Sequence, residues 1–141
     1  WVKGEPVTLS EGAGKNIYVV EFWATWCPPC RMSIPHLTKL QQKYAEKGVV
    51  IIGITDEKAD TVKPFIKKMG EKLKYRIALD EKLETQEAYD KVFSFDTIPT
   101  AFVVGKDGKI AWVGHPMSGL EETLEALTSA PLKKEDSPSK G

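Results

Sequence analysis

The sequence has no excess of charge of either sign and no long apolar run. Its 141 residues include 20 Lys and Arg and 20 Asp and Glu, so the formal net charge is zero at pH 7. Proteins that bind nucleic acid or a membrane surface are typically basic, and this balance indicates neither partner. No stretch approaches the about 18 consecutive apolar residues of a membrane-spanning helix. We therefore expect no nucleic-acid partner and no membrane segment in this chain.

Cysteine is scarce as well. The two cysteines, Cys27 and Cys30, both lie in the motif Cys27-Pro28-Pro29-Cys30. Small secreted proteins held together by disulfides contain more cysteines, spread along the chain. The chain is also long enough to bury an apolar core without disulfide support. The scarcity of cysteine therefore favours a catalytic pair over a structural framework.

Two cysteines separated by two residues can close a small disulfide and open it again. A strand-like apolar run precedes the motif, and a helix-like run follows it. At the first turn of that helix, the helix dipole would stabilise a Cys27 thiolate and lower its pKa from about 8.5 to roughly 3.5–7.5. Cys30, one turn further on, would resolve the mixed disulfide formed by Cys27. Pro28 and Pro29 are tolerated because first-turn N–H groups have no helical acceptor to lose.

The cysteine pair has other interpretations. A structural disulfide is one, although so small a loop constrains the unfolded chain little. A closed zinc site is another, but zinc normally takes four ligands, and only the isolated His36 and His115 accompany the pair. Two unrelated buried cysteines are a third. A protein that handles Cu(I) is a further alternative, because soft thiolates favour that ion.

Apolar runs alternating with amphipathic segments predict an α/β fold. Residues 17–23 and 49–54 are nearly continuous apolar runs, typical of parallel strands covered on both faces. An Asp-Gly turn at residues 107–108 indicates a hairpin of strands 101–104 and 110–113. The other expected elements are strands at 7–9 and 77–79, helices at 28–46 and 83–93, a helix capped by Asp60, and a last helix opened by a capping box at 118–121.

These elements predict a three-layer α/β/α sandwich around a mixed sheet. We expect a single domain over residues 1–131. Residues 132–141 are polar, and we expect them to form a disordered tail.

The motif at residues 23–31, WATWCPPCR in one-letter code, resembles the thioredoxin superfamily. More narrowly, it is similar to the TlpA/ResA-type thiol–disulfide oxidoreductases, in which a WCPPC motif is usual. The resemblance extends from about residue 7 to residue 127. It implies a thioredoxin-like fold with an extra strand and helix inserted before a cis-proline loop. It also implies an enzyme that reduces protein disulfides with no cofactor beyond the Cys27–Cys30 pair.

Glu21 stands six residues before Cys27, where thioredoxins carry a buried acid. The resemblance implies a proton-relay role opposite the resolving Cys30. Burial in an apolar run would also raise the pKa of this carboxyl, which suits acid–base work near neutral pH. The alternative is a Glu at a strand end that reaches solvent or a lysine. Residues 49–56 offer no lysine where thioredoxin has one beside its acid.

The segment Ile98-Pro99-Thr100 resembles the cis-proline loop that binds substrate beside the dithiol. A glycine after the last strand borders the substrate groove in this superfamily, and Gly114 occupies that place. By the same analogy His115 would lie near the dithiol, although an ordinary residue of a turn is the alternative. The resemblance thus implies a substrate-binding set of Trp26, Pro28, Ile98, Pro99 and Gly114.

The expected partners are disulfide-containing protein substrates and an electron donor that the sequence does not identify. We expect a monomer in the cytoplasm. The alternative is an exported or periplasmic domain whose signal or anchor has been removed, since the chain begins at Trp1 without an initiator methionine. A thiol peroxidase is a further alternative among redoxin-type relatives.

Overall fold

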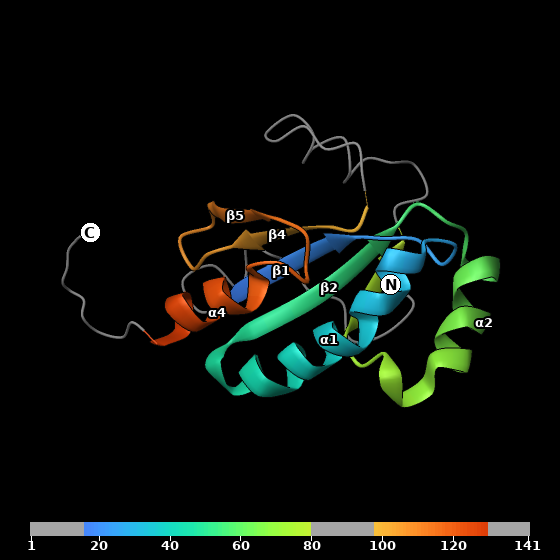
Figure 1. Cartoon of the computed structure of the whole chain (residues 1–141), viewed down its shortest axis with the longest axis horizontal. Helices are drawn as coiled ribbons and strands as arrows, with labels where there is room; N and C mark the ends of the chain where they lie inside the picture. The colour runs from blue at the N-terminus through green and yellow to red at the C-terminus, as the bar shows by residue number, and fades with distance from the viewer. Residues whose placement is uncertain (1–15, 80–97, 130–141) are drawn as a thin grey trace.

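The computed structural model describes residues 16–79 and 98–129 of the chain. This part contains a five-stranded mixed sheet in the order β3-β2-β1-β4-β5. Three α-helices lie on one side of the sheet (Figure 1). The strands are β1 (Ile17–Phe22), β2 (Val49–Thr55), β3 (Arg76–Leu79), β4 (Thr100–Val104) and β5 (Ile110–Gly114). The helices are α1 (Pro28–Tyr44), α2 (Ala59–Met69) and α4 (Leu120–Ser129).

β1 is the central strand of the sheet. It pairs in parallel with β2, with Ile17 opposite Val49, and antiparallel with β4, with Tyr18 opposite Val104. All six residues of β1 are buried, as a nearly continuous apolar run predicts. β3 extends the parallel side, and β5 closes the antiparallel side through the expected hairpin. The left-handed Gly108, with φ of 80°, lies in the hairpin turn.

The two faces of the sheet bury separate apolar clusters. One cluster joins β1, β2 and β4 to residues of all three helices, including Leu37 of α1, Val62 of α2 and Leu124 of α4. A second cluster on the opposite face includes Tyr18, Phe102 and other residues of the central strands. The strand expected at 7–9, the helix expected at 83–93 and the tail at 132–141 lie outside the described residues.

α1 begins at the cysteine motif, with Pro28 and Pro29 as its first two residues. It ends at Tyr44, two residues earlier than expected, because residues 45–47 tighten into a 3₁₀ turn. Gly48, with φ of 84°, then lets the chain reverse into β2. The chain that leaves α1 thus returns as β2, parallel to β1. The carboxyl ends of both strands therefore lie next to the start of α1.

Two helix starts differ from the sequence-based expectation. α2 begins at Ala59 after an extended Lys58, so Asp60 lies in the first turn and is not the N-cap. The first turn is closed instead by N–H groups of Thr61 and Val62, which donate to the Lys58 carbonyl. α4 begins at Leu120, two residues after Ser118. Within the described ranges, no helix is both long and apolar enough to cross a membrane.

Candidate active site

Cys27 occupies the N-cap of α1 and forms a disulfide with Cys30. Their Cα atoms lie 5.2 Å apart. The backbone N–H of Cys30 donates to the Cys27 Sγ at 3.2 Å. The sulfur therefore accepts a bond at the positive end of the helix dipole, where a thiolate would be stabilised. This is the place that the sequence predicted for the nucleophile.

The dithiol lies under an exposed rim. Cys30 is fully buried, and Cys27 exposes 3% of its surface. Trp26 next to it exposes 68% of its surface, and Met32 in the next turn exposes 73%. Pro28, at the first position of α1, is exposed as well. Apolar side chains thus face solvent beside Cys27, the more accessible residue of the pair.

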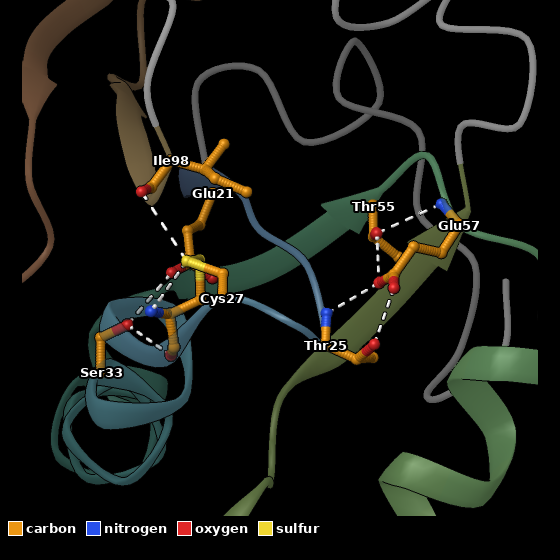
Figure 2. The surroundings of a disulfide bond; sticks show 8 residues. Glu21, Thr25, Cys27, Ser33, Thr55, Glu57 and Ile98 are labelled. Atoms are coloured by element: carbon orange, nitrogen blue, oxygen red, sulfur yellow. Dashed lines mark hydrogen bonds between the residues drawn. A yellow bond between two sulfur atoms is a disulfide. The ribbon is translucent and has the colours of Figure 1, made fainter.

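The loop before β4 reaches the dithiol from the other side. The Ile98–Pro99 peptide bond is cis, as the resemblance implies. The carbonyl oxygen of Ile98 lies 3.8 Å from the Cys27 Sγ (Figure 2). This contact joins residues 71 positions apart, so the fold brings the proline loop and the cysteine motif together.

Glu21 is the buried acid of the site. It exposes 1% of its surface and lies opposite Gly53 of β2 and Ala101 of β4. Figure 2 shows its side chain pointing from β1 toward the disulfide. Burial raises its pKa from 4.5 to about 8, although the Ser33 hydroxyl, which donates to Oε2 at 3.4 Å, lowers it in part. The alternative of an acid that reaches solvent is wrong, because the side chain is enclosed.

Comparison with known proteins assigns the family. The sequence profile of the redoxin family matches residues 2–127. The chain belongs to the redoxin family.

This redoxin is 36% identical over 131 residues to the thiol-disulfide oxidoreductase ResA of Bacillus thuringiensis subsp. konkukian, covering 90% of the chain and 72% of the relative. Among solved structures it is similar to a thioredoxin-family thiol:disulfide interchange protein from Chlorobium tepidum TLS, with 27% identity, a TM-score of 0.75 and 90% and 89% of the two chains covered. It is also similar to StoA from Bacillus subtilis, with 29% identity, a TM-score of 0.65 and 80% and 82% covered. The redoxin therefore has a thioredoxin-like fold and is a thiol–disulfide oxidoreductase.

A second carboxylate, which the sequence analysis missed, holds the loop in front of Cys27. Glu57 accepts from the Thr25 backbone N–H at 2.8 Å through Oε1 and from the Thr25 hydroxyl at 2.7 Å through Oε2. The Thr55 hydroxyl also donates to Oε1 at 2.9 Å (Figure 2). β1 and β2 are parallel, so their carboxyl ends meet at one edge of the sheet, where ligand sites of α/β proteins gather. The feature of the sequence that could have indicated this carboxylate is the set of polar residues directly after the apolar run at 49–54.

Gly114 and His115 have local roles in the redoxin. Gly114 ends β5, and a Cβ added there would lie 2.7 Å from the Trp112 ring. This glycine therefore leaves room for a tryptophan, and its place at a substrate groove stays a prediction. His115 is exposed, and its Nδ1 accepts from the Met117 backbone N–H at 3.1 Å. That bond fits the alternative of an ordinary turn residue.

In the described part of the chain, no three His, Cys, Asp or Glu residues are grouped to hold a metal ion.

Proposed function

We propose that the protein reduces disulfides of protein substrates, with Cys27 as the attacking thiolate. The observation that carries this proposal is the place of the Cys27 Sγ at the N-cap of α1, where it accepts the Cys30 N–H. In the reduced protein the Cys27 thiolate attacks one sulfur of the substrate. The substrate S–S bond breaks, a Cys27–substrate disulfide forms, and the other substrate sulfur leaves as a thiolate.

Cys30 completes the exchange with help from Glu21. The Glu21 carboxylate takes the proton of the Cys30 thiol, and the Cys30 thiolate attacks Cys27. The mixed disulfide breaks, the Cys27–Cys30 disulfide forms, and the second substrate sulfur leaves as a thiolate that takes up a proton. A raised pKa of about 8 supports this role, because proton exchange is most effective when the pKa lies near the working pH.

We further propose that the substrate backbone lies along the Ile98–Pro99 loop. The short distance from the Ile98 carbonyl to Cys27 supports this, because a segment bound at the loop would bring its own sulfur to the nucleophile. The exposed Trp26 and Pro28 would contact the substrate on the α1 side. Gly114 completes the proposed groove by resemblance alone.

The reduction potential of the Cys27–Cys30 pair tests the direction of the reaction. The protein is equilibrated in thiol redox buffers, its free thiols are alkylated, and the products are counted by mass spectrometry. We expect a value near that of thioredoxin, about −270 mV, which marks a reductase. A value near −120 mV, typical of strong oxidants, would instead assign disulfide formation to the protein.

Two single cysteine variants test the order of attack. Cys30→Ser should trap a mixed disulfide between Cys27 and a substrate protein, because no thiol remains to resolve it. Cys27→Ser should trap none and should lose all turnover. Insulin reduction and non-reducing mass spectrometry provide the two readouts. Retained turnover in Cys27→Ser would reject the assignment of the nucleophile.

We also propose a monomer in the cytoplasm that receives electrons from a separate donor. Cell fractionation tests the compartment, and size-exclusion chromatography tests the oligomeric state. Titration of the reduced protein with Cu(I) tests the copper alternative, which requires a tight complex.

A further inference from the structure

Ser33 is a buried polar residue of α1 to which the proposed mechanism assigns no role. It lies one helical turn after Cys30 and exposes 0% of its surface. Its hydroxyl oxygen lies 2.9 Å from the Cys30 carbonyl oxygen and 3.4 Å from Oε2 of Glu21 (Figure 2). One side chain therefore contacts both the resolving cysteine and the buried acid of the site.

The Ser33 hydroxyl has a single proton for these two acceptors. The distance of 2.9 Å to the Cys30 carbonyl is normal for a hydrogen bond, and the distance of 3.4 Å to Glu21 is long. This arrangement is expected while the Glu21 carboxyl is protonated, because a neutral acid competes weakly for the donor. A carboxylate is a stronger acceptor and forms shorter bonds. Ionisation of Glu21 should therefore turn the hydroxyl from the Cys30 carbonyl to Oε2.

This change of acceptor leaves the Cys30 carbonyl paired. A carbonyl oxygen has two lone pairs, and in an α-helix it accepts the N–H group four residues later. For Cys30 that donor is Ile34, and both residues belong to α1. The carbonyl keeps this main-chain bond when the hydroxyl turns away, so the change costs little free energy.

The two oxygens of Glu21 differ in their contacts. Oε2 has the bond from Ser33, whereas Oε1 is buried and has no hydrogen-bond partner among the described residues. Figure 2 shows the side chain of Glu21 pointing toward the disulfide. Ser33 thus holds one oxygen and leaves the other open to the proton of Cys30 in the reduced protein.

The other groups around Glu21 bring no charge that would stabilise its carboxylate. Its partners in β2 and β4 are Gly53 and Ala101, which have no titratable side chain. The two cysteines on α1 are neutral as a disulfide, and Cys27 is also neutral in a mixed disulfide with substrate. Tyr75, in the same buried cluster as the cysteines, stays neutral because burial raises its pKa. Within the described ranges, the Ser33 bond is therefore what offsets the burial of the Glu21 charge.

We propose that Ser33 is a positioning residue for the resolving step: its hydroxyl bonds Glu21 while the acid is ionised and returns to the Cys30 carbonyl when Glu21 takes the proton of the Cys30 thiol. The Cys30 thiolate then attacks Cys27, and the mixed disulfide breaks as the Cys27–Cys30 disulfide forms. This role rests on the proton transfer proposed above for Glu21. Ser33 itself neither gains nor loses a proton in the step.

The first test is the pKa of Glu21 in the oxidised protein, measured by 13C NMR of the carboxyl group. Ser33→Ala removes the hydroxyl and preserves α1, because alanine is a good helix former. We expect the pKa of Glu21 to rise by about half a pH unit or more, because the carboxylate loses its donor. An unchanged or lower pKa would overturn the proposal and leave Ser33 as an ordinary helical serine bonded to the preceding turn.

The matched control is Thr38→Val in the same helix. Thr38 is also buried, and its hydroxyl donates to the Lys72 carbonyl at 2.7 Å and accepts from the Lys74 N–H at 2.9 Å. This variant loses a buried hydroxyl whose partners are main-chain groups of another segment. It should lower stability and leave the pKa of Glu21 unchanged. A rise equal to that in Ser33→Ala would overturn the proposal, since the effect would not depend on contact with Glu21.

The rate of the resolving step tests the consequence for the reaction. The reduced protein is mixed with glutathione disulfide and quenched with acid, and the decay of the Cys27 adduct is followed by mass spectrometry at several pH values. In Ser33→Ala the increase of the rate with pH should move to higher pH. A rise of half a unit in the pKa of Glu21 should make the step about threefold slower at neutral pH, because less of the acid is ionised.

Glu21→Gln separates this proposal from the proton role on which it rests. A full rate of resolution in Glu21→Gln would reject the proton role, whatever the pKa measured in Ser33→Ala. If Glu21→Gln is slow, the double variant Glu21→Gln with Ser33→Ala should be no slower, because Ser33 acts through Glu21. A further loss as large as that of Ser33→Ala alone would overturn the positioning role and leave the proton role of Glu21 standing.

Discussion

Glu21 carries its carboxyl group inside the core, where bulk water cannot solvate the charge. Its pKa of about 8 in the folded protein lies above the value of 4.5 expected for the unfolded chain. Folding therefore favours the protonated acid. The residue that suits the proposed proton transfer is also one that weakens the folded state at neutral pH.

The stability of the oxidised protein should fall as the pH rises from about 4.5 to about 8. Below this window Glu21 is protonated in both states, and above it the carboxyl is ionised in both, so the loss then stays constant. A shift from 4.5 to about 8 corresponds to a loss of roughly 5 kcal/mol. Glu21→Gln should remove most of this dependence. Urea unfolding at several pH values measures the difference.

The matched control for this pH profile is Glu46→Gln, because Glu46 is exposed in the 3₁₀ turn that follows α1. It should preserve the slope of the parent protein. If Glu21→Gln keeps that slope as well, the pKa of Glu21 is not raised in the folded protein.

At the scale of elements, the loop between β1 and α1 determines where Cys27 lies. This loop is held at Thr25 by two bonds to Glu57, which follows β2. The bonded residues are 32 positions apart in the sequence. Pairing of the two parallel strands therefore sets the position of the nucleophile, and Glu57 acts as a positioning residue.

Thr25→Val should loosen this loop, because it removes the hydroxyl bond to Glu57 and keeps the size of the side chain. We expect a loss of about 1–2 kcal/mol in stability and slower disulfide exchange. Thr25→Ser keeps the hydroxyl and should restore the rate. The readouts are the rate of insulin reduction and the reduction potential of the dithiol. Equal rates and potentials for Thr25→Val and Thr25→Ser would contradict the positioning role.

The elements differ in how far the sequence determines them. The apolar runs of β1 and β2 were sufficient to predict two buried parallel strands. The start of α2 was not predictable in this way, because it depends on the extended backbone of Lys58 and not on a capping side chain. The helical pattern of apolar residues gives the buried face of α2 but not its first residue.

The residues of the candidate site also differ in how far the sequence predicts them. The motif at 27–30 and the loop at 98–99 were predicted from short sequence patterns that resemble a known superfamily. Glu57 was not predicted, because it does not stand in a motif. Its contact with the loop before Cys27 arises only when β2 pairs beside β1.

At the scale of the whole molecule, α1 and α4 pack side by side on one face of the sheet. Leu120 and Leu124 of α4 are fully buried in the cluster that includes both cysteines. The same helices are joined at the surface by Lys43 and Glu121, whose charged atoms lie 2.9 Å apart. Apolar burial rather than this exposed ion pair should hold α4 in place.

Leu124→Ala should therefore destabilise the protein by about 2–5 kcal/mol, because it leaves a cavity in the core. Lys43→Ala removes the exposed ion pair and should cost no more than about 1 kcal/mol. Urea unfolding of the two oxidised variants measures both losses. A larger loss for Lys43→Ala than for Leu124→Ala would show that the surface contact dominates.

The low exposure of Cys27 also bears on which client proteins can react. Only 3% of this residue is accessible, and the Ile98 carbonyl oxygen lies 3.8 Å from its Sγ, so an attacking sulfur has little free surface to approach. For the proposed reductase we therefore expect a disulfide on an exposed or locally unfolded segment of a substrate to react, and a disulfide buried in a rigid native protein to resist reduction.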